Sequence, residues 1–325
     1  MPDRFSLLAG LLGAVLLMSS AVKAETIRLS LPPDPNALPV FVLMEKQDKL
    51  LPEDTLELVA LPAGDPSGMR AMIADQRMDF AMFNLVGGTR FFQGGLEDLQ
   101  LVSPWVWRGV YLLTPEGEED LAALDSAAVL TSPGVSTPPH TMIARALEQK
   151  GIEPRFATGG AGSALFSRLR DPEKAPAGVA APEPLVSLIE HHQKAQDWDQ
   201  RWQVALDPTE ALGGEIPLGA LWQVGDSVGP AVRERLVSGL RRAAEWAQDP
   251  ANREETARIA AEGYRHTFRM PIPPQVLAGL LHEQRVAWRL DTDGSTRPRV
   301  EEYLDEVFGM RVPEGLYAEP AQAND

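Results

Sequence analysis

Short strand-like segments alternate with longer helix-like segments along most of the chain. Alternating or continuous apolar residues indicate the strands, and apolar residues three or four positions apart indicate the helices. The predicted strands cover residues 26–31, 55–61, 78–83, 100–105, 110–114, 127–130, 155–158, 178–181, 202–206 and 218–223. The predicted helices cover residues 38–49, 66–76, 138–150, 164–170, 185–194, 230–248, 254–264, 274–290 and 300–308, with a helical turn at 89–93.

This order of segments predicts an α/β fold. Strands that alternate with helices of about a dozen residues form parallel sheets covered by helices. The chain of 325 residues is long enough for two such units, and the final helices would pack back onto the first sheet. Residues 312–325, which include small, charged and proline residues, are expected to form a loose tail.

Residues 1–24 have the three-part pattern of a secretory signal peptide. A positively charged start precedes an apolar run at residues 5–18, and Val22 and Ala24 put small side chains where a signal peptidase needs them. Cleavage after Ala24 would leave the mature chain in the periplasm, with no direct membrane insertion. The alternative is an N-terminal helix that stays in the membrane, although the run is short for a spanning anchor.

The composition excludes several kinds of chemistry and several partners. The chain has no cysteine, which rules out a lipid anchor, thiolate metal sites, cysteine nucleophiles and iron–sulfur clusters. Its formal net charge of −16 disfavours nucleic acid and anionic lipid, which bind to basic patches. The five histidines lack the HExxH spacing, so no metal and no cofactor is expected.

The segments that follow the predicted strands contain the candidate ligand-binding residues. In open α/β sheets, ligands bind beyond the carboxyl ends of the strands. This rule selects Asp34, Asn36, Phe83, Asn84, Ser136, Thr137, His140, Gly160, Ser163 and Glu183, and Trp107 is added because its indole could cover an apolar part of a ligand. Each segment also has an ordinary explanation as a turn, a connector, a helix cap or a core residue.

The charge of the ligand stays open at this level. Ser136 or Thr137 can cap the helix that Pro138 begins, and free N–H groups at a helix start favour a carboxylate, a sulfonate or another anion. Asp34 and Glu183 favour a cation or a polyhydroxyl compound instead.

Four segments resemble a known family in their order and spacing. They are residues 26–46 (TIRLSLPPDPNALPVFVLMEK), 68–83 (GMRAMIADQRMDFAMF), 132–151 (SPGVSTPPHTMIARALEQKG) and 178–185 (GVAAPEPL). Together they resemble the periplasmic solute-binding proteins of ABC importers, in the family that includes nitrate-, alkanesulfonate-, taurine- and thiamine-precursor-binding proteins.

The resemblance implies a type II periplasmic-binding-protein fold. Each of two lobes would contain a mostly parallel sheet with helices on both faces, and two crossover strands would join them. Lobe one would comprise residues 25–103 and 206–311, and lobe two residues 104–205. A monomer would close on a small organic solute or oxyanion and deliver it to an ABC permease in the inner membrane, without catalysing a reaction.

Two other functions remain open from the residues alone. A secreted, hydrolase-like enzyme on a two-lobe scaffold would need a pair of facing carboxylates or a Ser–His pair, which need not be close in sequence. A periplasmic sensor or binding protein without an importer would share the same fold. The eukaryotic branch of the resembling family that makes a pyrimidine phosphate depends on a cysteine-rich motif, so the lack of cysteine excludes that activity.

Overall fold

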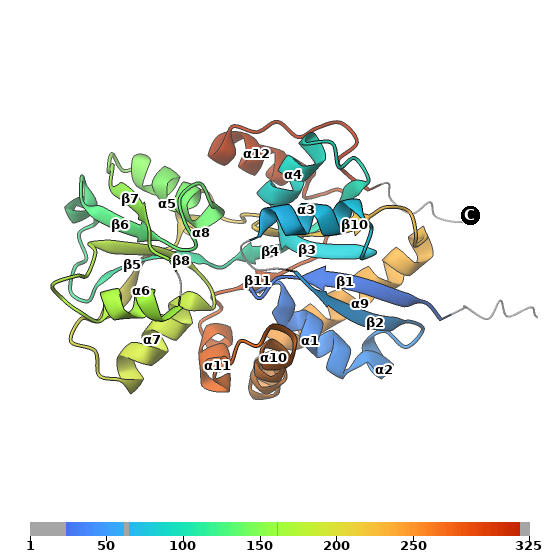
Figure 1. Ribbon diagram of the computed structural model, residues 1–325, viewed down its shortest axis with the longest axis horizontal. Coiled ribbons are helices and arrows are strands. Elements are labelled where there is room, and N and C mark those ends of the chain that lie inside the picture. The colour runs from blue at the N-terminus through green and yellow to red at the C-terminus, as the bar shows by residue number, and fades with distance from the viewer. Residues whose placement is uncertain (1–23, 62–64, 161, 319–325) are drawn as a thin grey trace, which may run out of the picture.

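The structure, a computed structural model, describes residues 24–61, 65–160 and 162–318, and contains two β-sheets side by side (Figure 1). The predicted signal peptide lies outside these residues, apart from its last position. The strands of the first sheet are β1 (Thr26–Leu31), β2 (Thr55–Ala60), β3 (Phe80–Asn84), β4 (Leu99–Arg108), β10 (Gly219–Val224) and β11 (Ala287–Trp288). Those of the second are β5 (Val110–Pro115), β6 (Ala128–Thr131), β7 (Arg155–Thr158), β8 (Gly178–Pro182) and β9 (Trp202–Leu206).

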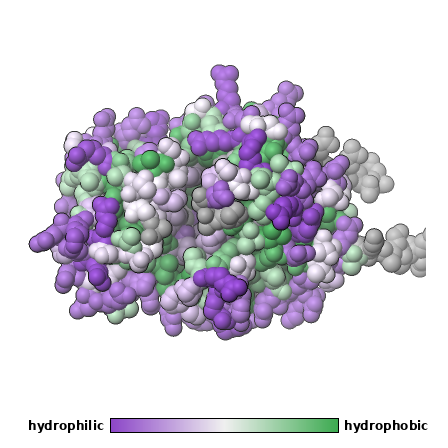
Figure 2. Space-filling view, in the orientation of Figure 1, coloured by the Kyte–Doolittle hydropathy of each residue, from purple (hydrophilic) through white to green (hydrophobic). Residues whose placement is uncertain are grey.

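Helices surround both sheets (Figure 1). Around the first sheet are α1 (Ala37–Glu45), α2 (Gln47–Leu50), α3 (Pro66–Ala74), α4 (Leu85–Gln93), α9 (Pro230–Gln248), α10 (Arg253–Phe268), α11 (Pro274–His282) and α12 (Arg297–Phe308). Around the second are α5 (Pro138–Glu148), α6 (Gly162–Leu169), α7 (Leu185–Ala195) and the short α8 (Pro208–Ala211). Short 3-10 helices cover Leu121–Leu124 and Pro250–Asn252. Figure 2 shows hydrophilic side chains over much of one face, with apolar residues between them.

The α/β fold class is confirmed, and each sheet has a parallel core that antiparallel strands extend. The strand orders are β11-β4-β10-β3-β1-β2 and β7-β6-β8-β5-β9. In the first sheet β1 runs parallel to β2 and β3, whereas β10 is antiparallel to β3 and β4. In the second, β6 runs parallel to β7 and β8, whereas β5 is antiparallel to β8 and β9. The antiparallel pairs arise from the path of the chain. β5 and β10 each begin at the side of their sheet where the parallel strands end, so they run in the opposite direction.

The core of the first half is built around α1. Its sequence, ALPVFVLME, is apolar on every side, and residues 37–43 are all buried because α9 and α10 pack against it. Phe41 makes edge-to-face contacts with Tyr264 (5.3 Å between ring centroids) and Phe268 (6.0 Å). Gly263 permits this approach, since a Cβ there would lie 2.3 Å from the Phe41 ring. The packing fixes α10 against the loop that precedes α1.

Two segments differ from the sequence-based prediction. The predicted helix 274–290 is α11 followed by β11, because the chain turns at Gln284 (φ 50°) and residues 287–288 add to the edge of β4. Residues 312–318 of the predicted loose tail pack against the first sheet: Leu316 is fully buried, and Leu101 bonds to both Leu316 and Ala318 through its backbone. In both cases an edge of the sheet supplies hydrogen bonds that no local pattern reveals.

Candidate functional site

The carboxyl ends of the parallel strands in the two sheets meet where β4 passes into β5. At the start of β10, Gly219 pairs with Asn84 at the end of β3 and with Val106 near the end of β4. Val110, the first residue of β5, pairs with Pro182, the last residue of β8. Since β5 follows almost directly on β4, the edge where β3 ends adjoins the edge where β8 ends. We call the loops at this junction (residues 32–36, 84–88, 132–140, 159–163 without residue 161, and 182–185) the strand-end site.

Asp34 and Asn36 lie together in the loop between β1 and α1. The Asp34 carboxylate accepts hydrogen bonds from the backbone N–H (2.9 Å) and the side-chain Nδ2 (2.7 Å) of Asn36. Asp34 is partly exposed, but the surrounding protein removes much of its water and raises its pKa to about 6, against the effect of the two hydrogen bonds. No basic residue contributes to this pKa, so the carboxylate has only neutral donors.

Three buried aromatic side chains hold the backbone of this loop. The carbonyl oxygens of residues 34, 35 and 36 accept hydrogen bonds from Tyr264 Oη (2.7 Å), Trp288 Nε1 (2.8 Å) and Trp105 Nε1 (3.1 Å). The donors come from α10, β11 and β4, which are far apart in sequence. The position of Asp34 is therefore set by tertiary contacts.

Asn84 and Phe83 have separate roles at the end of β3. The Asn84 side-chain oxygen accepts a hydrogen bond from the Gly87 N–H (2.6 Å) and so caps α4, which begins directly after the strand. Phe83 is 1% exposed and stacks on Trp222 with 5.5 Å between ring centroids. Asn84 thus remains at the strand-end site, whereas Phe83 belongs to the core.

The expected cap of α5 is not formed as the sequence suggested. Thr137 occupies the N-cap position, but its hydroxyl donates to the Gly134 carbonyl instead of accepting from the helix. Ser136 adopts a positive φ of 64°, and its N–H donates to His140 Nδ1 (3.2 Å). The His140 ring lies edge-on to Phe156, and burial lowers its pKa, so His140 is neutral at pH 7.

The glycine-rich segment after β7 adjoins the segment after β6. The Ser132 hydroxyl donates to the Gly160 carbonyl (3.1 Å), and a Cβ at Gly134 would lie 3.4 Å from Thr158 Oγ1. Gly160 has a φ of 74°, which favours glycine, and Ser163 is exposed in the first turn of α6.

Glu183 is buried where the two halves of the molecule touch. Its carboxylate accepts from the Ser187 N–H (3.1 Å) at the start of α7, and lies 3.5 Å from an Arg285 guanidinium nitrogen. Burial raises the Glu183 pKa to about 7, although Arg285 lowers it. Arg285, between α11 and β11, also pairs with Glu190 (2.6 Å) and Glu283.

Asp34 and Glu183 both act on Tyr264. Burial raises the pKa of this hydroxyl well above its ordinary value, and the charges of Asp34 and Glu183 both add to the effect. The structure thus brings one acid from the first half and one from the second close enough to act on one phenol. Sequence reasoning identified both acids but not Tyr264 or Arg285, which sit in helical patterns with no feature to distinguish them.

Trp107 is committed to contacts within the protein. It is 4% exposed, its Nε1 donates to the Arg289 carbonyl (3.0 Å), and the Arg289 guanidinium lies 4.3 Å from the ring centroid. The structure therefore places this indole in packing and not on an open surface.

A GxSxG pattern, typical of the nucleophile elbow of hydrolases, occurs at residues 225–229 between β10 and α9. Ser227 donates to the Asp79 carboxylate (2.8 Å), which is also held by Arg28, and Ser227 is not among the residues with positive φ. The hydroxyl therefore has a carboxylate acceptor in place of a histidine base. This segment lies at the other end of β10 from Gly219, outside the strand-end site.

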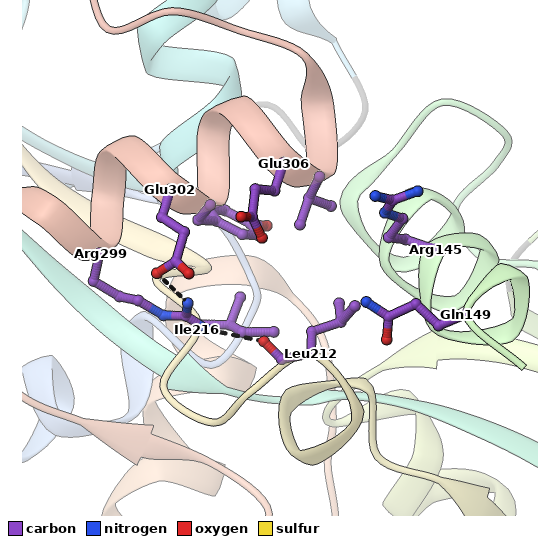
Figure 3. A pocket seen from close by; sticks show the side chains of 9 residues that line it. Arg145, Gln149, Leu212, Ile216, Arg299, Glu302 and Glu306 are labelled. Carbon is purple, nitrogen blue, oxygen red and sulfur yellow. Dashed lines mark hydrogen bonds and ion pairs between the residues drawn. The ribbon is translucent and has the colours of Figure 1, made fainter.

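A small pocket of about 320 Å³, including open solvent, lies apart from the strand-end site. Arg145 and Gln149 of α5 face Glu302 and Glu306 of α12 across it (Figure 3). None of the residues that line it is a candidate from the sequence. The pocket marks a gap beside the contact between α5 and α12.

Within residues 24–61, 65–160 and 162–318, no helix is long and apolar enough to span a membrane. No group of three or more histidine and acidic side chains in the same residues could hold a metal ion.

No family model matches this sequence, and no curated protein matches it. Solved structures do share its fold. The periplasmic aliphatic sulphonate-binding protein SsuA from Escherichia coli matches with a TM-score of 0.66 and 15% identity, over 92% of this chain and 94% of that chain. The zinc-bound ligand-binding component of an ABC-type import system from Staphylococcus aureus matches with a TM-score of 0.65 and 15% identity, over 91% and 97%.

The periplasmic nitrate-binding protein NrtA from Synechocystis PCC 6803 matches with a TM-score of 0.57 and 16% identity, over 80% of this chain and 70% of that chain. The chain therefore has the fold of the type II periplasmic solute-binding proteins, as its sequence predicted. At these identities, the fold is what the neighbours share with it.

Proposed function

We propose that this protein is the substrate-binding component of an ABC importer and captures a small solute between its two halves. The observation that carries the proposal is the junction of β4 with β5, where the carboxyl ends of parallel strands from both sheets meet. Ligands of α/β sheets bind at such ends. The fold, shared with solute-binding proteins across about nine-tenths of the chain, supports the same conclusion.

The proposed lobes are residues 25–103 with 206–311, and residues 104–205. The solute would bind in the strand-end site, and the lobes would close on it by a hinge motion at the crossover strands. An ABC permease in the inner membrane would then receive the solute from the periplasm. The protein acts as a monomer in this proposal and catalyses no reaction.

Ligand-dependent stabilisation and closure test this proposal. A solute at 100 times its Kd should raise the free energy of unfolding by about 2.7 kcal/mol, seen as a higher Tm. Small-angle scattering should show a smaller radius of gyration with the same solute. The hydrolase alternative would use the Asp34 and Glu183 carboxylates, so each stabilising solute is also followed for turnover. Turnover, or the absence of any stabilising small solute, would contradict the proposal.

Solute uptake in cells that lack the cognate permease distinguishes an importer component from a sensor. An importer component should lose solute uptake when either this protein or the permease is removed. A sensor would leave uptake unchanged.

A further inference from the structure

We infer that the strand-end site takes a small organic cation with N–H donors and rejects oxyanions. The inference rests on the proposed function and narrows its ligand. It separates this chain from the sulphonate- and nitrate-binding proteins whose fold it shares. Three features of the site support the inference. N–H groups at helix starts are bonded or missing, the site segments contain acids but no lysine or arginine, and an unpaired hydrogen-bond acceptor lies beside Asp34.

At four helix starts of the site, part of the N–H groups that could bind an anion is already bonded or absent. Asp34 accepts the N–H that precedes α1, Asn84 caps α4, and Glu183 accepts the Ser187 N–H of α7. The first two residues of α5 are both proline and have no N–H at all. An oxyanion is normally held by free N–H groups at a helix start, so these bonds and prolines reduce the number that it could use at α1, α4, α5 and α7.

The charge of the site is negative. None of the five segments contains lysine or arginine; of their two acids, Glu183 is paired with Arg285, whereas no basic residue described by the structure acts on Asp34. The nearest basic groups are already paired: Arg285 with three glutamates, and Arg108 with Asp207 (through Nε, 2.6 Å) and Glu210. An anion in the site would meet uncompensated carboxylate, whereas a cation would reduce the cost of keeping Asp34 ionised away from water.

An unpaired acceptor lies next to the Asp34 carboxylate. Asn36 is 4% exposed, and its Nδ2 donates a hydrogen bond to the Asp34 carboxylate. This bond fixes the orientation of the amide, because a flipped amide would place its oxygen against a carboxylate oxygen. Its Oδ1 is buried and has no hydrogen-bond partner among the described residues. A buried acceptor without a donor costs about 1–3 kcal/mol. A ligand that carries N–H groups would supply both the donor for Asn36 and the charge for Asp34.

Matched pairs of opposite charge test the inference on the intact, purified protein. Benzamidine is compared with benzoate, ethylammonium with ethanesulfonate, and a library of biogenic amines and guanidines with nitrate, sulfate and short sulfonates, all by thermal shift and then calorimetry. We expect stabilisation by members of the cationic set alone. Asp34→Asn should weaken the best cation at least tenfold, while Asp226→Asn, an exposed acid in the loop after β10, should leave its affinity unchanged.

The outcomes separate the two proposals. Binding of an oxyanion by the natural protein would overturn the cation assignment and keep the receptor function. Binding by neither set would overturn the cation assignment, and the receptor function would fall as well once neutral solutes also give no stabilisation. Because the matched pairs are compared in the natural sequence, the result does not depend on whether the Asp34 variant folds.

Discussion

The Arg285 guanidinium and the Glu183 carboxylate lie 3.5 Å apart although they belong to opposite halves of the molecule. Arg285 precedes β11 of the first sheet, and Glu183 follows β8 of the second. Glu183 is fully buried and the Arg285 side chain is 10% exposed. The Tyr111 hydroxyl of β5 donates to the Arg285 carbonyl (2.7 Å), which ties the same residue to the second sheet a second time. Arg285 is therefore a point of attachment between the halves.

Arg285→Ala should lower the free energy of unfolding by about 3 kcal/mol. The substitution leaves the Glu183 charge buried without its partner, and breaking a buried pair on one side is strongly destabilising. Urea denaturation at pH 7.5 measures the change. Arg145→Ala is the control, because the Arg145–Glu148 pair is on the surface and should contribute less than about 1 kcal/mol. Equal effects of the two substitutions would show that Arg285 does not stabilise the contact between the two halves.

Glu183 should make stability fall as the pH rises from about 4.5 to 7. Burial raises its folded pKa to about 7 from 4.5, so the folded protein binds a proton in this window that the unfolded chain has lost. The contribution is fully present below the unfolded pKa and disappears as the pH passes 7. Glu183→Gln removes the titration, and the stability of the natural protein relative to this variant should fall by on the order of 3 kcal/mol across the window. Urea denaturation at several pH values measures it, and parallel curves would contradict it.

The affinity for a bound cation should fall below a pH of about 6. Burial raises the Asp34 pKa to about this value, and protonation removes the charge that attracts the ligand. Calorimetry between pH 5 and 8 should show an affinity that is constant above a pH of about 7. Below the Asp34 pKa, the affinity should fall by up to about tenfold for each pH unit. Tyr264, Glu183 and His140 are the other titratable groups at or beside the site. The Asp34 effect is therefore isolated in a Glu183→Gln background, with His140→Gln as a second background. An affinity that rises on acidification would indicate an anionic ligand.

Gly219→Ala should weaken ligand binding and lower stability by about 1–3 kcal/mol. A Cβ at this position would lie 2.5 Å from Asn36 Oδ1 and 3.2 Å from Val106 Cβ, so the Asn36 amide would have to move away from Asp34. Thermal unfolding and ligand titration measure the two effects. Gly279→Ala in α11 is the matched control, because its Cβ would meet nothing within 4 Å. It should raise stability by about 0.5–1 kcal/mol, since alanine suits a helix better.

The sequence by itself determined the order of strands and helices and the residues at the strand ends. Period and turn residues are local properties, so α9 is found at the residues predicted, and Asp34, Asn84 and Glu183 follow strands as expected. Local pattern also placed Pro138 at the start of α5. It failed at residues 287–288 and 312–318, where the chain pairs with β4, a partner distant in sequence.

Only the tertiary structure decided how the strand-end residues are used. It brought Asp34 and Glu183 near enough to Tyr264 to act on its hydroxyl, paired Arg285 with Glu183, and packed Trp107 against Arg289. It also showed that Asp34, Asn84 and Glu183 each accept one N–H at the start of α1, α4 or α7, and that α5 begins with two prolines. Desolvation and ion pairing depend on which side chains meet in space, and a linear pattern contains no information about that meeting.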